Sequence, residues 1–160
     1  MKMNEGVEWA MHSCVNLSWL PGEAVTAKRL AAFYDLPTAY LNKQLQALTR
    51  AGILSSVSGP KGGFQLARDP RNITLLDIVV AIDGSDEAFR CLQILKAGPG
   101  ADPKADYREV CLVSQAMRAA ELTYRRELAG TTIGDIVADV EKQTPAAPDN
   151  TRNWFANLKS

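Results

Sequence analysis

Side chains that could bind a metal or undergo redox chemistry are few in this chain. It has 3 cysteines, Cys14, Cys91 and Cys111, and 1 histidine, His12. Such a small, odd number of cysteines does not suit a secreted disulfide framework, and reduced thiols more often bind metal or sense redox state. Glu8 precedes His12 by four residues, so on a helix the two side chains share one face. Metal binding and thiol chemistry are therefore the reactions that these residue types offer.

The positions of these residues separate one cysteine from the others. On a helix, Cys14 points about 200° away from His12, which predicts a structural thiol in the core. Cys91 and Cys111 flank residues 97–103, where small residues and prolines predict an irregular loop. Taken alone, a single histidine is more typical of a surface position than of a ligand. A glutamate near the start of a helix is commonly only a favourable charge at the helix N-terminus.

Basic residues are concentrated between Thr26 and Arg71. This stretch holds seven basic residues against two acidic ones, whereas the whole chain has a formal net charge of +0. A basic module on a chain that is neutral overall is typical of a protein that binds selected DNA sites. The alternative is that the module is used only for contacts with other proteins.

The hydrophobic pattern of the basic stretch predicts the elements that position it. Two short helices, 27–34 and 37–51, are expected around a tight turn, and Gly52 ends the second. This is the helix-turn-helix unit, whose second helix enters the major groove of DNA. The period then changes to about 2 over 53–57 and 64–67, on either side of a segment rich in glycine and proline. That pattern predicts a β-hairpin, the wing of a winged helix.

Helices are also expected before and after this module, over 4–20, 75–82 and 133–142, together with a long one from 104 or 106 to about 129. The long helix carries an apolar stripe that is too large to leave exposed, consisting of Val110, Val113, Met117, Ala120, Tyr124 and Leu128. We expect the stripe to pair two copies of the chain, with folding back on its own domain as the alternative. A twofold homodimer would present two recognition helices to a pseudo-palindromic operator in double-stranded DNA.

The fold class expected is therefore mainly α with a small β-hairpin wing, a winged helix-turn-helix plus a long dimerisation helix. The units are a DNA-binding domain (1–83), a cysteine-bearing loop (84–105), dimerisation helices (106–142) and a weakly structured tail (143–160) whose two aromatics dock locally. With 46% hydrophobic residues and no signal peptide or membrane-spanning run, the chain is expected in the cytoplasm, with no membrane partner. No catalytic pattern or phosphate-binding loop is present, so an enzyme is not expected.

These residues carry a family resemblance over residues 1 to about 142. The element order, Tyr40-Leu41 early in the second helix, the wing sequence GPKGGFQLA (59–67) and a cysteine-bearing loop before a long helix resemble the Rrf2 family of bacterial regulators. Members are dimeric winged-helix transcription factors. Several hold a 2Fe-2S or 4Fe-4S cluster through three closely spaced cysteines in that loop.

The chain departs from that ligand pattern, because no third cysteine lies between Cys91 and Cys111. It is closer to the RsrR type of the family, a redox regulator whose 2Fe-2S cluster is bound by two cysteines, a histidine and a glutamate. The resemblance implies Cys91, Cys111, His12 and Glu8 as ligands here, and imidazole is an accepted replacement for thiolate in such clusters. Trp9, next to Glu8, is then expected to respond to redox state, although a simple core position for it is equally compatible.

The resemblance also implies which residues contact DNA. Those near the start of the recognition helix read bases, two on the preceding helix bind phosphates, and two lie at the wing tip. They are Thr38, Tyr40, Lys43 and Gln44; Lys28 and Arg29; and Lys61 with Gly62. Many family wings carry arginine where this chain has Ser58, so minor-groove reading is expected to be weaker or to depend on Lys61.

Two other functions are open at this point. In one, the DNA-binding dimer has no cluster, and Cys91 and Cys111 form a disulfide under oxidation. In the other, the chain is an interaction module stabilised by zinc, since two cysteines, a histidine and a glutamate also suit that metal.

Overall fold

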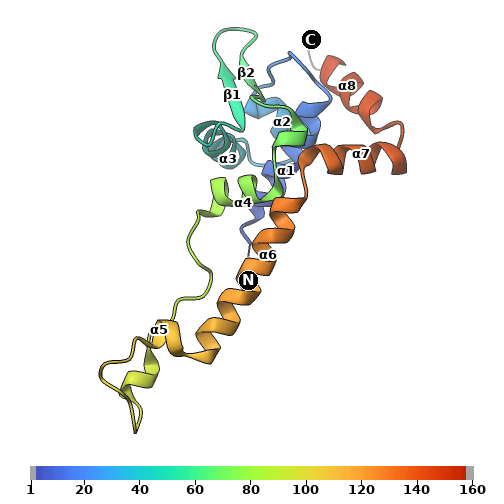
Figure 1. Ribbon diagram of the computed structural model, residues 1–160. Helices are drawn as coiled ribbons and strands as arrows, with labels where there is room; N and C mark the ends of the chain where they lie inside the picture. The colour runs from blue at the N-terminus through green and yellow to red at the C-terminus, as the bar shows by residue number, and fades with distance from the viewer. Residues whose placement is uncertain (1–2, 158–160) are drawn as a thin grey trace.

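The N-terminal body of the molecule is a winged helix. The computed structural model describes residues 3–157; residues 1–2 and 158–160, at the ends of the first and last predicted units, lie outside them. Helices and strands of the body are α1 (Glu5–Ser18), α2 (Ala27–Phe33), α3 (Thr38–Arg50), β1 (Leu54–Val57), β2 (Gly63–Leu66) and α4 (Leu75–Asp83). A short 3₁₀ turn, η1 (Pro70–Asn72), joins β2 to α4. Figure 1 shows α2, α3 and α4 gathered around α1, with the hairpin projecting beyond them. The predicted fold class is confirmed.

The apolar faces of the body helices form one core. On α3 the three leucines expected to face inward, Leu41, Leu45 and Leu48, are fully buried. They pack with Leu30 of α2 and with Ile78 of α4 in a single cluster of buried side chains. The apolar residues spaced three and four apart on α3 therefore form its buried face, as the sequence predicts.

The two strands of the wing are antiparallel, with Leu54 opposite Leu66 and Val57 opposite Gly63. The hairpin is anchored to the body at one more point, because Val25 and Phe64 exchange backbone hydrogen bonds of 2.9 and 2.8 Å. A Cβ atom on Gly63 would lie 2.3 Å from the backbone of Val25, and its φ of +142° is one that glycine tolerates. Glycine is thus required where the wing crosses the start of the helix-turn-helix.

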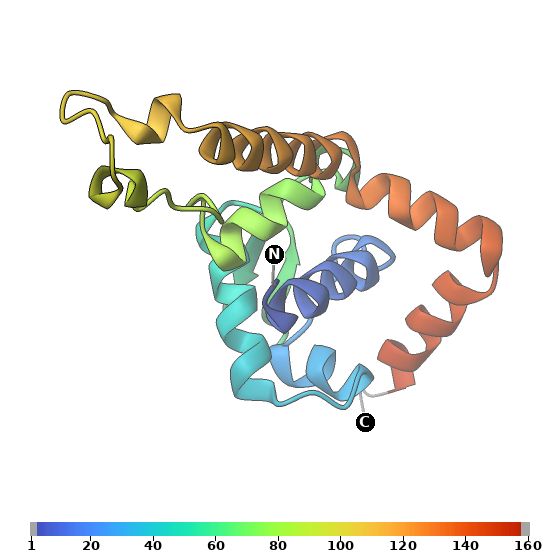
Figure 2. The ribbon, with the colours of Figure 1, turned by 90° about the horizontal axis from the view of Figure 1, so that it is seen from below.

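Beyond α4 the chain leaves the body and returns along one long helix. The segment contains a 3₁₀ turn, η2 (Ile94–Ala97), a single helical turn, α5 (Tyr107–Val110), and the helix α6 (Leu112–Gly130). We call residues 85–117 the distal arm. In Figures 1 and 2 its loop, η2 and α5 lie at the end of α6 that is remote from the body.

The long helix was expected to be continuous from residue 104 or 106, and this expectation is wrong. It is interrupted at Cys111, whose φ of −71° and ψ of 119° are extended and which both ends α5 and begins α6. The break places Cys111 at the junction of the two helices, as the C-cap of α5 and the N-cap of α6.

The C-terminal segment is more ordered than expected. Helix α7 (Ile133–Gln143) starts with a capping box made by Thr132 and Asp135. The tail predicted to be weakly structured instead forms helix α8 (Ala147–Asn157), in which Phe155 is fully buried. Its aromatic residues dock locally, as expected, because the rings of Trp154 and Phe155 lie 4.9 and 5.3 Å from that of Phe33 on α2. Figure 2 shows α7 and α8 curving round toward α2.

Among residues 3–157, none of the helices combines the length and the hydropathy that a membrane crossing requires.

Candidate functional site

The exposed side of α3 presents part of the predicted DNA-reading set. Thr38 and Lys43 are exposed, and Tyr40 is half-buried on the first turn. Since the N-terminal part of the second helix is the part that contacts base edges in a helix-turn-helix, these side chains have the required position on the element.

Gln44 does not belong to that surface. Only 5% of it is exposed, and it lies against α1, where a Cβ atom on Gly6 would come within 2.7 Å of the Gln44 Cδ atom. In this conformation Gln44 therefore offers almost no surface for the predicted DNA contact. The sequence spacing could have indicated this burial, because Gln44 lies three residues after Leu41 and four before Leu48, on the apolar face of α3. Its amide is used to bring α1 and α3 together.

Tyr40 connects the same two helices. Its hydroxyl donates a hydrogen bond of 2.9 Å to Oδ1 of Asn4, and that oxygen also accepts from the backbone N–H of Gly6 as the N-cap of α1. The ring of Tyr40 lies edge-on to Trp9, with 5.0 Å between the ring centroids. The N-terminal part of α1, with its N-cap, and the first turn of α3 are thus joined by a hydrogen bond and an aromatic contact.

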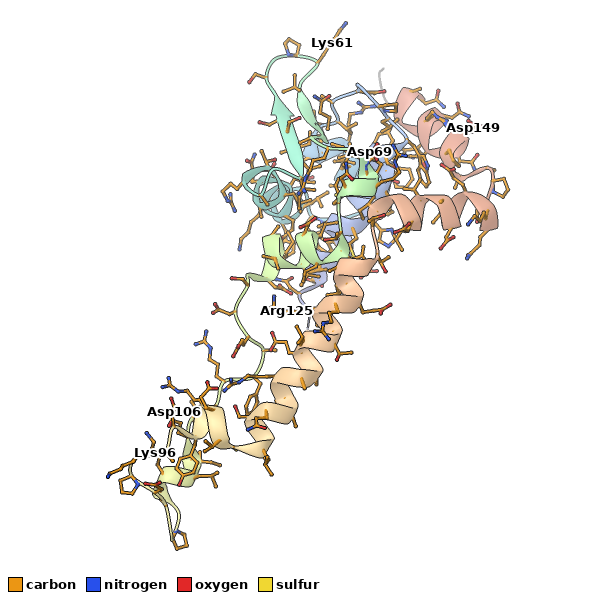
Figure 3. All side chains as sticks on the ribbon, viewed as in Figure 1. Lys61, Asp69, Lys96, Asp106, Arg125 and Asp149 are labelled. Carbon is orange, nitrogen blue, oxygen red and sulfur yellow. The ribbon has the colours of Figure 1, made fainter. Side chains whose placement is uncertain are left out.

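At the wing tip only one of the two predicted residues is accessible. Lys61 is exposed and points away from the end of the hairpin (Figure 3). Gly62 is buried; its N–H donates to the carbonyl of Gly59 at 2.9 Å, and a Cβ atom would lie 2.2 Å from the Val57 carbonyl oxygen. A DNA contact by Gly62 is therefore not available in this conformation. The glycine shapes the turn that presents Lys61.

The two basic residues of α2 differ in the same way. Lys28 is exposed, whereas the Arg29 side chain is 21% exposed and lies 3.5 Å from the carboxylate of Glu23. Arg29 also donates through Nη2 to the backbone carbonyl of Phe155 on α8. Its guanidinium is bound within the chain, so a phosphate contact by Arg29 would require these partners to be exchanged.

Other cations of the basic stretch are paired as well. Arg71 forms an ion pair of 2.7 Å with Asp69, and this partner lowers the pKa of the Asp69 carboxyl to about 2. Arg68 donates to backbone carbonyls of Gly52 and Asn72. Among the residues that the structure describes, no ion pair involves Lys28, Lys43, Arg50 or Lys61. The positive surface open to DNA therefore consists of fewer residues than the sequence count.

The predicted ligands on α1 lie on its outer surface. Glu8 and His12 are exposed, one turn apart as their spacing requires. Both line a mainly apolar pocket of about 420 Å³, whose other walls include Met11, Leu75 and Leu128. Leu128 belongs to the C-terminal end of α6, so this pocket lies where α1 meets that end of the long helix.

The two cysteines predicted as ligands, Cys91 and Cys111, contact the same backbone carbonyl group in the distal arm. The Sγ atom of Cys91 lies 3.8 Å from the backbone carbonyl oxygen of Tyr107, and the N–H of Cys111 donates to the same oxygen at 3.2 Å. Two cysteines twenty residues apart in sequence therefore contact one carbonyl group, Cys91 through its thiol and Cys111 through its backbone N–H. Both cysteines are half-buried, and Cys91 opens on a cavity of about 290 Å³ that Arg108 and Arg118 also line.

The two pairs are far apart within one chain. Cys111 begins α6, whereas the pocket of Glu8 and His12 adjoins Leu128 near its other end, about 25 Å along the helix axis. Accordingly, no group of three or more histidine, cysteine or acidic residues suited to a metal is found within residues 3–157. The thiol of Cys14 is fully buried, as predicted, and burial raises its pKa to about 12.

Comparison with known proteins shows which protein family has these features. The sequence model of the Rrf2 family, described as iron-dependent transcriptional regulator, matches residues 3–139. The chain is 26% identical over 149 residues to BadM of Rhodopseudomonas palustris, described as an HTH-type transcriptional regulator, covering 93% of this chain and 91% of that protein. It is 34% identical over 108 residues to protein aau3 of Rhizobium meliloti, covering 68% and 66%.

Solved structures have the same fold. IscR of T. potens superposes with a TM-score of 0.66 at 21% identity, covering 90% of this chain and 91% of that one. CymR, described as the global cysteine regulator of B. subtilis, has a TM-score of 0.63 at 22% identity, covering 86% and 97%. At sequence identities of 21% and 22%, these structures show a shared fold and nothing more about function. Helix α8 lies outside the residues that the family model matches.

Proposed function

This chain belongs to the Rrf2 family of transcriptional regulators, which bind DNA and are not enzymes, and from that premise we propose that it is a dimeric redox sensor. In this proposal a 2Fe-2S cluster is bound by Cys91 and Cys111 of one copy and by Glu8 and His12 of the other. The observation that best supports this proposal is that the four side chains form two pairs, which lie at opposite ends of α6. Each pair is accessible and incomplete, so two copies in opposite orientation would complete each other.

The chemistry of the residues suits such a group. Thiolates are the commonest ligands of iron-sulfur clusters, and the group supplies one-electron redox chemistry when it is bound. Cys111 is the extended N-cap residue of α6, at the break between α5 and α6, and it is half-buried. Glu8 and His12 stand on an open face of α1 and are in no ion pair among the described residues.

Exposed apolar side chains in the distal arm support the proposal that two copies of the chain associate. Leu112 is 78% exposed and Val113 is 64% exposed at the start of α6, and Leu92 of the adjacent loop is 83% exposed. Met117, one turn after Val113, is 43% exposed, so residues 3–157 of the same chain leave these four apolar side chains largely uncovered. Monomeric proteins rarely expose contiguous apolar surface of this kind, so these side chains are the proposed dimer contact.

The route from sensor to DNA follows the contacts between α1 and α3. Any displacement of α1 acts directly on Tyr40 through Asn4 and Trp9, and on α3 through the close contact of Gly6 with Gln44. We therefore expect a change at Glu8 or His12 to alter the position of the recognition helix. The DNA contacts proposed for that helix and its neighbours are Thr38, Tyr40, Lys43, Lys28 and Lys61, with a pseudo-palindromic operator as the target.

The first experiment is anaerobic purification followed by a visible spectrum and assays of iron, sulfide and zinc. About two iron and two sulfide per chain are expected for the wild type. The His12→Ala variant should have an altered spectrum, whereas Cys14→Ala, which changes a thiol buried in the core on the other side of α1, should not. Colourless, iron-free protein from cells well supplied with iron would overturn the cluster and leave the alternatives.

A complementation experiment tests whether the ligands come from two chains. Co-expression of Cys91→Ala and His12→Ala chains yields a heterodimer in which one of the two sites retains every ligand. Iron content near half that of the wild type is expected for this heterodimer, and little for either variant alone. If all ligands came from one chain, the heterodimer would contain no intact site and would gain nothing.

One observation favours a second candidate. Cys91 and Cys111 adjoin the same carbonyl group, so a disulfide between them is a reasonable alternative switch in a regulator without a cluster. Loss of free thiols on mild oxidation, together with a changed affinity for DNA in an iron-free and zinc-free preparation, would support it. Stoichiometric zinc instead would support the zinc-stabilised interaction module.

A further inference from the structure

Arg29 lies beside the proposed DNA contacts of α2 and the wing, although its guanidinium is bound within the chain. A groove of about 660 Å³ runs between the start of α2 and the wing, and both Arg29 and Lys61 line it, together with Thr26 and Gly62. Lys61 is the exposed cation of the wing tip (Figure 3). A DNA backbone that meets the wing and the first turn of α2 would therefore pass close to Arg29.

Helix α8 holds Arg29 in its observed position. The backbone carbonyl of Phe155 accepts a hydrogen bond from Arg29 Nη2, and the guanidinium carbon lies 5.5 Å from the centroid of the Phe155 ring. Glu23 contributes an ion pair of 3.5 Å. These partners neutralise the charge of Arg29 and direct it toward α8.

The arrangement leaves Arg29 incompletely satisfied. Its Nε atom is buried and has no hydrogen-bond partner. A buried N–H without an acceptor is unfavourable, whereas a phosphate can accept two parallel N–H bonds from one guanidinium. Arg29 would therefore gain a bond by exchanging the Phe155 carbonyl for a phosphate group.

Helix α8 packs on the molecule through its buried face, which carries Pro148, Thr151 and Phe155. Phe155 is its fully buried aromatic, and it stacks on Phe33 of α2 with an angle of 5° between the rings. Trp154 is half-buried beside them, and the opposite side of α8, including Asn153, is exposed. Among the described residues of α8, only Phe155 is a buried member of the core cluster, and Trp154 and Ala147 pack against it. The other buried members lie outside α8, so displacement of the helix would remove one of them and leave the rest in place.

We propose that α8 is an autoinhibitory element that withholds Arg29 from the DNA backbone, so that displacement of α8 adds one phosphate contact per protomer. The proposal requires DNA binding but no cluster. It concerns the strength and salt dependence of binding to any duplex, and therefore it can be tested on iron-free protein with DNA of unrelated sequence.

The test compares two substitutions at one exposed position of α8. Asn153→Pro interrupts the helix, because proline lacks the N–H and clashes with the preceding turn, whereas Asn153→Ala preserves it. Neither substitution changes charge. Affinity for a duplex of unrelated sequence is measured against salt concentration for both variants, with and without Arg29→Ala.

Asn153→Pro should bind about fivefold to tenfold more tightly at 0.1 M salt per added contact, and its plot of log affinity against log salt should steepen by about 0.9 per protomer. Asn153→Ala should match the wild type. Arg29→Ala in the Asn153→Pro background should return the slope to the wild-type value. An unchanged slope in Asn153→Pro, or a steeper slope that persists without Arg29, would overturn the proposal.

Two single substitutions on α2 provide a second test that does not depend on breaking α8. In the otherwise unchanged chain, Lys28→Ala should flatten the salt dependence by about 0.9 per protomer, because Lys28 is exposed on the same helix. Arg29→Ala should leave the slope within error of the wild type. Equal flattening by both variants would mean that Arg29 already contacts DNA, and the inhibitory role of α8 would be rejected.

Discussion

The winged-helix body and the distal arm differ in how they treat apolar side chains. In the body, Leu48 is fully buried, as are the other leucines of the same face of α3. In the distal arm, Leu92 is 83% exposed and Leu112 is 78% exposed. Both regions contain leucine side chains, but only the body has several helices that pack against one another and cover its hydrophobic surface (Figure 1).

The difference indicates which region can fold alone and which needs a partner. A domain buries its apolar surface when two layers face each other. The distal arm is a loop and one end of a helix, so it has no second layer in its own chain. The candidate ligands follow the same division, since the thiol pair lies in the arm and the carboxylate and imidazole pair lies on the body.

The largest expected effect contrasts the two regions directly. Leu48→Ala should lower the free energy of unfolding of the body by about 2–5 kcal/mol, because it removes buried methyl groups and leaves a cavity. Leu92→Ala, an identical change at an exposed position, should alter it by less than about 0.5 kcal/mol. Urea unfolding followed by tryptophan fluorescence measures both. A comparable loss in Leu92→Ala would show that the arm belongs to the body's core.

The second effect should occur in the arm and not in the body. Leu112→Gln is expected to weaken self-association by about 1.5–3 kcal/mol per copy, the value of burying a leucine side chain. Val57→Gln is the matched control, because Val57 is 41% exposed on the outer side of β1. Sedimentation equilibrium reports the dissociation constant. Unchanged association in Leu112→Gln would place the dimer contact elsewhere or remove it.

Much of the body could be predicted because its signals are local. The periodicity of α3, the N-cap residues of α2 and α4 and the glycines of the wing each act within a few residues of chain. Helix α8 was missed because Pro145 and Pro148 indicate irregular structure. Pro148 is in fact the second residue of α8, a position where a missing N–H costs nothing.

The site was harder to predict than the fold because its contacts are distant in sequence. Arg29 carries a charge that suggested a phosphate contact, but its partner is a carbonyl 126 residues further along. Gln44 is polar, but it fills a space left by Gly6 on another helix. Conversely, the meeting of Cys91 and Cys111 depends on the path of the whole distal arm, which no local pattern specifies.

A smaller effect is expected from the turn of the wing. Gly62→Ala places a Cβ atom 2.2 Å from the Val57 carbonyl oxygen, so the hairpin must distort. Overpacking of this kind costs about 1–3 kcal/mol, and DNA affinity should fall because the tip that carries Lys61 is displaced. Gly59→Ala is a useful comparison: nothing lies within 4 Å of its Cβ position, and only its φ of +98° is unfavourable. Equal loss of affinity in both would implicate backbone strain instead of the clash.

The smallest effect distinguishes charges that the body leaves open from those that it neutralises. Lys61→Ala should reduce the slope of log affinity against log salt by about 0.9 per protomer, because one phosphate contact is lost. Arg71→Ala should leave the slope nearly unchanged although the Arg71 side chain is 80% exposed, because Asp69 binds its guanidinium at 2.7 Å. Fluorescence anisotropy titrations at several salt concentrations give both slopes. If the two variants were equivalent, exposure alone would determine which cations meet DNA, and the ion pairs of the body would have no part in restricting its basic surface.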